Sequence, residues 1–397
     1  MWCPRLDHFA NIDNHGKVSR CPNMTYPDSY SKLYTTRNKS MRCSLVDHYL
    51  KLNAPNTIGS CHYLVPHSRF NTIDEWQNSE RLARIRESHK NDIFPPDCIR
   101  CKQDEEGGRV SRRAWQEQYH EEWLKIREDY LRVNLELDVE CNAACPFCDP
   151  ALSSLFAKLA GVTVPKYDGL KHLMSLGIDL KRIVELDIVG GEPSISKNVE
   201  RLLVDEVDRF TLQRVRVFTN GSKVMRWLPS LLERGVAVDL MVSYDGTGRI
   251  FEYSRWPIKW SKFIKNVDFY QDMREKYPNL TMATGTTMTA FNIFDMDTCS
   301  DFAKAKDMEL RIVVSSRPKD IHAFCNNTLT RIGKAALERS PNEYVRSFAG
   351  SVAIEKEDNT PQLIAAMRGI DAMRSINFLD YCEDYPEVVE AMKIYQI

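Results

Sequence analysis

Residues 131–314 alternate between short apolar runs and amphipathic stretches, and this alternation constrains the fold more than any other feature of the sequence. Six runs rich in Val, Ile and Leu have the length of buried strands: Val133–Val139, Ile183–Val189, Val215–Phe218, Val236–Val242, Thr281–Thr287 and Leu310–Val314. Amphipathic segments such as Val199–Phe210 and Trp256–Lys276 lie between them. Repeated strand–helix units favour parallel strands joined by crossover helices. We therefore predict an α/β sheet or partial barrel, with ligands at the carboxyl ends of its strands.

Charge and hydropathy exclude several classes of protein. The 397 residues include 54 Lys and Arg against 55 Asp and Glu, a formal net charge of −1. Such a balance gives no broad electrostatic attraction to nucleic acid or to anionic membranes. No apolar run is long enough to span a bilayer, and the first residues lack the basic-then-apolar pattern of a secretory signal. We expect a cytoplasmic protein that does not bind membranes.

The sequence contains twelve cysteines, and three of them lie close together. In a reducing cytosol, clustered cysteines indicate metal or redox chemistry rather than disulfides. Cys141, Cys145 and Cys148 directly follow the first expected strand. Three thiolates on such a loop can hold three irons of a cubane cluster and leave the fourth iron open to a small ligand. Zinc stays open as an alternative, although structural zinc usually takes four protein ligands.

Three further strand ends carry glycines or small polar residues. Gly190–Glu192 follows the second strand, where glycines let the backbone approach a ligand closely and a carboxylate can accept from an ammonium group. Asn220 follows the third strand, and Ser243 and Asp245 follow the fourth. Their polar groups lie where ribose hydroxyls can be bound. Any one of these segments alone would be an ordinary turn.

In this order, the features resemble the radical SAM superfamily over about residues 131–318, because Cys-x3-Cys-x2-Cys with an aromatic residue before the last cysteine is that family's signature. The resemblance implies a partial (β/α)6 barrel of TIM type, in which the three cysteines bind a 4Fe–4S cluster that chelates S-adenosylmethionine. Reductive cleavage of this cofactor would give a 5′-deoxyadenosyl radical that abstracts hydrogen from a substrate. The implied cofactor contacts are Phe147, Gly190, Gly191, Glu192, Asn220, Ser243 and Asp245, with Thr286 and Val313 on the later strands.

The N-terminal region is rich in loops and holds a second set of cysteines: Cys3, Cys21, Cys98 and Cys101. Turn residues predict a hairpin over 11–18, and residues 73–90 have helical spacing that Pro95 and Pro96 terminate. This order resembles SPASM/twitch domains, although those commonly follow the barrel and here the region precedes it. The resemblance implies an auxiliary 4Fe–4S cluster on these four cysteines, with zinc as the alternative.

The remaining cysteines receive simpler interpretations. Cys43 and Cys61 lie in an insertion and are expected to be buried or free thiols, as are Cys299 and Cys382 in helical contexts. Cys325 follows the sixth strand and is a candidate hydrogen donor to a substrate radical. The chain thus divides into an auxiliary-cluster domain (1–107), a connecting helix (108–130), a radical SAM barrel (131–325) and a C-terminal helical extension (326–397).

We expect an enzyme that acts on a peptide, a protein or a related metabolite, with electrons from a flavodoxin- or ferredoxin-like donor. The substrate class comes only from the resemblance, because a fold does not fix its chemistry. Modification of nucleotides or tRNA is an alternative if basic residues form one face beside the barrel mouth, namely Arg112, Arg113, Lys125, Arg127 and Arg132. A zinc or iron–sulfur protein without catalytic activity is the other alternative.

Overall fold

One large sheet organises the protein. The computed structural model describes residues 11–12, 18–19, 42–54, 56–61, 63–64, 70–107, 111–315, 321–323, 325–352 and 357–395. Within these ranges eight strands are hydrogen-bonded in the order β10-β9-β8-β7-β6-β5-β3-β4. All neighbours are parallel except β4, which pairs antiparallel with β3 at one edge. The sheet is therefore mostly parallel and open between β10 and β4.

The six predicted strands are confirmed, and each pairs with the next along the chain. They are β5 (Leu131–Glu136), β6 (Ile183–Val189), β7 (Arg214–Thr219), β8 (Ala237–Ser243), β9 (Leu280–Met288) and β10 (Glu309–Val314). The expected α/β class and partial barrel are confirmed as well. The core runs along the whole sheet, because most apolar side chains of these strands are fully buried, including Leu186, Val217 and Leu240.

Two further strands come from the N-terminal region and were not predicted. β3 (Tyr49–Asn53) lies parallel to β5, and β4 (Thr57–Gly59) returns antiparallel beside β3. Leu50, Leu52 and Ile58 belong to the main core cluster. Residues 49–59 therefore share one sheet with the barrel strands, inside the part of the chain expected to form a separate cluster domain.

The other N-terminal elements agree largely with the sequence. β1 (Asn11–Ile12) and β2 (Val18–Ser19) pair antiparallel, which confirms the predicted hairpin. The predicted helix over 73–90 is divided into α3 (Ile73–Gln77) and α4 (Glu80–Lys90), because Ser79 caps a new helix start. The remaining helices of this region are α2 (Leu45–His48), α5 (Ile99–Glu106) and the expected connecting helix α6 (Arg112–Ile126).

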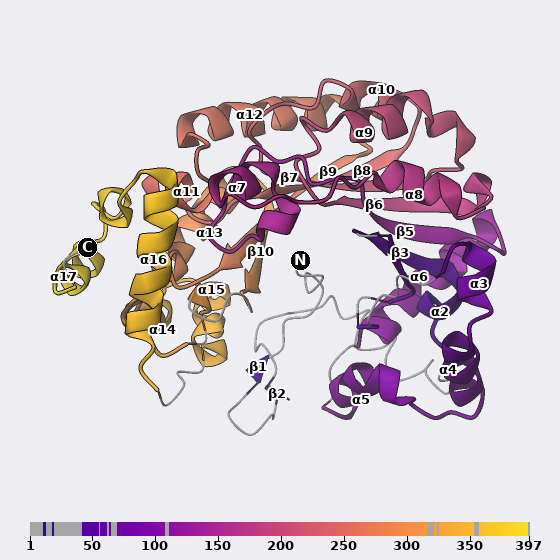
Figure 1. Ribbon diagram of the computed structural model, residues 1–397, viewed down its shortest axis with the longest axis horizontal. Coiled ribbons are helices and arrows are strands. Elements are labelled where there is room, and N and C mark those ends of the chain that lie inside the picture. Colours follow the sequence, from indigo (N-terminus) through magenta and orange to yellow (C-terminus); the bar gives the residue numbers. More distant parts are fainter. Residues whose placement is uncertain are drawn as a thin grey trace.

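Helices cover the outer side of the sheet and flank its two ends (Figure 1). Those between the barrel strands are α7 (Ser154–Leu159), α8 (Gly169–Ser175), α9 (Lys197–Glu200), α10 (Leu228–Glu233), α11 (Gly248–Ser254), α12 (Trp260–Lys276) and α13 (Met296–Ala305). The expected helical extension is α14 (Thr328–Arg339), α15 (Glu343–Ser347), α16 (Thr360–Arg374) and α17 (Pro386–Lys393). Within the described ranges, no helix combines the length and the apolar character needed to cross a membrane.

Candidate functional site

The concave side of the sheet encloses a cavity of about 2160 Å³. Side chains in a strand alternate between its two faces, so every second residue lines this cavity. The inward-facing positions include Lys51 and Asn53 on β3, Arg132, Asn134 and Glu136 on β5, Glu185 and Asp187 on β6, Arg214, Arg216 and Phe218 on β7, and Asp239, Met241 and Ser243 on β8. This volume is at least twice that of ordinary small-molecule pockets, which span roughly 300–1,000 Å³.

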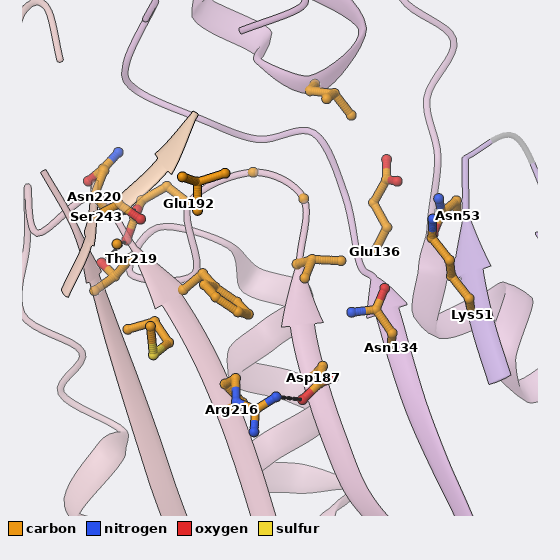
Figure 2. Close-up of a pocket in the computed structure, with 18 of the residues that line it drawn as sticks. Lys51, Asn53, Asn134, Glu136, Asp187, Glu192, Arg216, Thr219, Asn220 and Ser243 are labelled. Atoms are coloured by element: carbon orange, nitrogen blue, oxygen red, sulfur yellow. Dashed lines mark hydrogen bonds and ion pairs between the residues drawn. The ribbon is translucent and has the colours of Figure 1, made fainter. Parts of the chain in front are cut away.

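Charged residues form much of the cavity floor. The Arg216 guanidinium lies 3.2 Å from Asp187 and 3.5 Å from Asp239, and Arg132 forms a close ion pair with Glu185. Figure 2 shows Asp187 and Arg216 facing each other between Asn134 and Glu136 on one side and Thr219, Asn220 and Ser243 on the other. Buried charges are costly unless they are paired. These ion pairs therefore allow the inner face of the sheet to be polar.

Cys141, Cys145 and Cys148 all line this cavity, on the loop that follows β5. Burial raises the pKa of Cys141, and the nearby Cys145 thiol raises it further. Burial also raises the pKa of Cys148 to about 12, again with Cys145 as the second cause. Desolvation raises the pKa of all three thiols, so a bound metal centre, which carries positive charge, would favour their thiolate forms. The donor set therefore suits an iron–sulfur cluster.

Contacts from two distant segments hold the cysteine loop in place. Asn220 donates to Asn142 at 3.0 Å, and Asn142 donates to Ser222 at 2.9 Å. From the C-terminal extension, Arg374 on α16 donates to the carbonyl oxygen of Ala144 and, at 3.0 Å, to that of Tyr253. Asn220 thus contacts the cysteine loop itself. Sequence reasoning did not find Arg374, which lies 230 residues from Ala144.

The turn after β6 packs directly on the cysteine loop. Gly191 donates to Asp138 at 2.9 Å, and Glu192 donates through its backbone to Glu140 at 2.7 Å. A Cβ atom on Gly191 would lie 2.2 Å from the carbonyl oxygen of Glu140, so this approach requires glycine. Gly190 has a φ of +114°, a conformation that side-chain-bearing residues rarely adopt. The two glycines therefore permit close contact with the loop backbone that leads into Cys141.

The Glu192 carboxylate is buried and organises the neighbouring strand end. It accepts hydrogen bonds from the Thr219 hydroxyl at 2.6 Å, the Asn220 backbone at 2.6 Å and the Ser194 backbone at 3.0 Å. Burial raises its pKa, and these hydrogen bonds oppose that shift. Glu192 also lines the cavity.

The other sequence candidates divide into two groups. Phe147, Ser243 and Val313 line the cavity, as expected. Asp245 and Thr286, which are fully buried, and Cys325, which is 1 % exposed, are not among the lining residues. For Thr286 the reason is strand alternation, since its neighbours Gly285 and Thr287 face the cavity instead.

Asp245 forms a buried ion pair with Arg255, a residue that sequence reasoning missed. Asp245 also accepts from the Thr287 backbone at 2.5 Å. Arg255 lines the cavity, and its guanidinium lies over the Phe147 ring at 5.4 Å from the centroid. Burial acts to lower the pKa of Arg255, but the charge of Asp245 raises it above its ordinary value. The ion pair with Asp245 therefore holds Arg255 beside Cys145.

The predicted auxiliary site is described only in part. Cys3 and Cys21 lie outside the described residues, whereas Cys98 and Cys101 lie at the start of α5. No group of three or more His, Cys, Asp or Glu side chains in the described ranges is spaced to hold a single metal ion.

The basic face that would favour a nucleic-acid substrate does not form. Arg112 and Arg113 are each 3 % exposed, and Arg132 is buried against Glu185. Arg127 pairs with Asp129 and Asp179. Of these five residues only Lys125 is exposed.

Comparisons with known proteins found similarities over part of the chain. No family model matches the chain. The chain is 25% identical over 190 residues to molybdenum cofactor biosynthesis protein 1 of Dictyostelium discoideum. The aligned region covers 46% of this chain and 28% of that protein. The chain thus spans less than a third of that relative's length.

Two solved structures that contain S-adenosylmethionine are also similar. Native anSMEcpe with bound AdoMet is 17% identical, with a TM-score of 0.33 and coverage of 45% of this chain and 50% of that one. Streptococcus suis SuiB bound to S-adenosylmethionine is 13% identical, with a TM-score of 0.33 and coverage of 61% and 52%. These similarities cover only part of each chain, and the class of enzyme is the subject of the proposals below.

Proposed function

We propose that this chain is a radical SAM enzyme that cleaves S-adenosylmethionine and abstracts hydrogen from a substrate held in the cavity. One observation carries the proposal: Cys141, Cys145 and Cys148 share a cavity wall with the Gly190–Glu192 turn at the carboxyl ends of parallel strands. Ligands of such sheets bind at this edge. The donor set fits a cluster, and the adjoining turn offers a carboxylate to an ammonium group.

The protein's own groups have distinct tasks in this proposal. The three cysteines would hold a 4Fe–4S cluster, which with S-adenosylmethionine supplies one-electron reductive cleavage. Glu192 would accept a hydrogen bond from the methionine ammonium, and Ser243 would contact the ribose. Arg255 places a fixed positive charge near Cys145, where it stabilises the thiolate.

The cavity supports a substrate larger and more polar than a typical metabolite. Its volume exceeds that needed for S-adenosylmethionine alone, and its floor carries both signs of charge. Lys51 and Glu136 lie on the β3–β5 side of the cavity (Figure 2). We propose a peptide, a protein segment or a related metabolite with charged groups that these side chains recognise, and a flavodoxin- or ferredoxin-like protein as the electron donor. We also retain a second iron–sulfur centre that includes Cys98 and Cys101.

Anaerobic turnover tests the central proposal. The reconstituted protein is incubated with S-adenosylmethionine and dithionite, and 5′-deoxyadenosine is quantified by chromatography. We expect cleavage by the unaltered protein and none by Cys145→Ala, whereas Cys98→Ala retains slow cleavage uncoupled from substrate. Cys382→Ala is the matched control, because this buried cysteine lies far along the chain in the C-terminal extension. Equal activity of Cys145→Ala and the control would refute the assignment.

A further inference from the structure

Glu136 differs from other acidic side chains that line the cavity from the strands. Four of those side chains form ion pairs with an arginine: Glu185, Asp187, Asp239 and Glu309. Glu136 is the last residue of β5, is 6 % exposed and lines the same cavity. The Ala54 backbone donates a hydrogen bond to its carboxylate. Among the described residues, however, its Oε1 atom has no hydrogen-bond partner. A buried acceptor of this kind is costly unless a donor reaches it from outside the chain.

A second acceptor without a partner lies on the neighbouring strand. Leu52 of β3 is paired with Leu135 of β5, so the next residue on each strand, Asn53 and Glu136, lie side by side. Both face the cavity (Figure 2). In the part of the chain that the structure describes, Oδ1 of Asn53 is buried and accepts no hydrogen bond. Two adjacent acceptors require a ligand that is rich in donors. A primary ammonium group has three donors and no acceptor.

The charges around Glu136 favour a cationic ligand. Burial raises the pKa of Glu136 to about 7, and the negative charge of nearby Asp138 adds to this rise. The positive charge of Lys51 opposes the rise, but Oε1 of Glu136 still lacks a partner among the described residues. A buried carboxylate is stable when an opposite charge pairs with it and donates to it. An ammonium group supplies both the charge and the hydrogen bond.

Glu136 also lies beside the turn that follows β6. A Cβ atom on Gly190 would lie 3.0 Å from the Cγ atom of Glu136. Gly190 belongs to the turn that packs on the cysteine loop. A ligand held by Glu136 would therefore lie next to the segment proposed to contact S-adenosylmethionine, on the β3–β5 side of it.

The inner face of the sheet becomes apolar next to Glu136. Val189 is the residue of β6 that is paired with Glu136, and Phe218 follows on β7, where it is paired with Met241 of β8. All three apolar residues line the cavity. From β5 to β7 the distance is two strand spacings, about 10 Å. A ligand with its ammonium group at Glu136 would thus place an apolar portion over Val189 and Phe218.

We propose that Glu136 and Asn53 form an anchoring subsite for a primary ammonium group of the substrate, with an apolar portion of the same molecule over Val189 and Phe218. The proposal deepens the proposed function, on which it rests for the cavity being a substrate site, and it narrows the substrate class to primary amines. Two sources share this chemistry: the amino terminus of a peptide and the side chain of a lysine.

Binding of small amines tests the subsite without any turnover. The full chain is reconstituted anaerobically, and the probes are titrated into it by calorimetry. Phenylalaninamide represents an amino terminus, and Nα-acetyl-lysinamide represents a lysine side chain. Nα-acetyl-phenylalaninamide, which has no ammonium group, is the control probe. We expect at least one amine to bind about tenfold or more tightly than the control probe, because hydrogen bonds to charged groups are the stronger ones. The amine that binds more tightly identifies the source.

Three variants assign this binding to the subsite. Glu136→Gln keeps the shape of the side chain and removes its charge, so it should weaken amine binding about tenfold or more. Asn53→Leu removes the second acceptor and should weaken amine binding by a smaller factor; it also tests the subsite independently if Glu136→Gln does not fold. Glu309→Gln is the matched control, because this carboxylate lines the cavity but is 62 % exposed and pairs with Arg311. Its amine affinity should not change.

Two further measurements separate a lost subsite from a damaged protein. Glu136→Gln should keep the circular dichroism of the unaltered protein and its affinity for S-adenosylmethionine. Weaker binding of S-adenosylmethionine would overturn the proposal, because Glu136 would then contact the cofactor. Equal binding of the amines and the control probe would also overturn it, since water would then satisfy the two acceptors. The same holds if neither amine binds at up to about 10 mM, or if Glu136→Gln and Asn53→Leu bind amines normally. Amine binding without cleavage of S-adenosylmethionine would overturn only the proposed function.

Discussion

Replacing Asp245 with Asn tests whether this residue positions Arg255 or contacts a ligand. The Asp245 side chain is fully buried, and that of Arg255 is 12 % exposed. Asn keeps the shape and can still accept from the Thr287 backbone, so the change removes mainly the negative charge. A buried ion pair that loses one partner leaves an uncompensated charge, which typically costs about 3–5 kcal/mol. We expect the free energy of unfolding to fall by about 3 kcal/mol or more.

Urea unfolding of the metal-free protein, followed by circular dichroism, measures this loss. Asp208→Asn is the matched control, because Asp208 pairs with Arg234 at the surface, where the two side chains are 79 % and 42 % exposed. Exposed pairs contribute about 0–1 kcal/mol, so the control should lose little. Adding Arg255→Met to Asp245→Asn removes the unpaired charge and should recover more than half of the loss.

The opposite result would refute the positioning role. If Asp245→Asn unfolds like Asp208→Asn, and if it binds S-adenosylmethionine more weakly at unchanged stability, then Asp245 contacts the cofactor as its sequence position first suggested. An additive double variant would likewise show that Asp245 and Arg255 are energetically independent.

Three other changes test the site. Burial raises the pKa of Glu136 to about 7, above its ordinary value. The stabilising contribution of the protonated carboxyl is therefore present at low pH and is lost between about pH 4.5 and 7. Glu136→Gln should flatten this decline in the free energy of unfolding, by about 3 kcal/mol, in urea unfolding across this pH range. Gly191→Ala should abolish cleavage of S-adenosylmethionine, since the added Cβ atom has no room. Gly285→Ala on the cavity wall should fold normally, because no heavy atom lies within 4 Å of the added Cβ atom. Equal behaviour of the two variants would contradict the packing argument. Arg374→Met leaves a carbonyl of the cysteine loop without its charged donor, which is worth about 1.5–3 kcal/mol, and should speed iron loss to a chelator without changing the cavity.

The sequence predicted the long strands but not the short ones, and the reason is physical. Runs such as Ile183–Val189 are buried along almost their whole length, and five of their seven residues are apolar. β3 has only five residues, and Lys51 and Asn53 face the polar cavity, so its composition resembles a loop. β4 has three residues. Their strand conformation depends on pairing with β5, which is a tertiary interaction that local pattern does not report.

The residues of the candidate site could be predicted where they lie on one short segment. They could not be predicted where they depend on contacts with residues distant in sequence. Cys141, Cys145 and Cys148 lie on one loop, and strand alternation then places Ser243 in the cavity. The position of Asp245 depends on Arg255, ten residues later on another element, and the loop anchor Arg374 comes from the opposite end of the chain. No spacing rule links such residues before the fold is known.

The N-terminal cysteines extend this reasoning. The resemblance to SPASM/twitch domains grouped Cys98 and Cys101 with Cys3 and Cys21. The antiparallel return of β4 along β3 brings Cys61 toward the segment that holds Cys43. Arg113 connects that segment to α5. These contacts depend on strand pairing and on a buried arginine, which are tertiary interactions that order along the chain does not report.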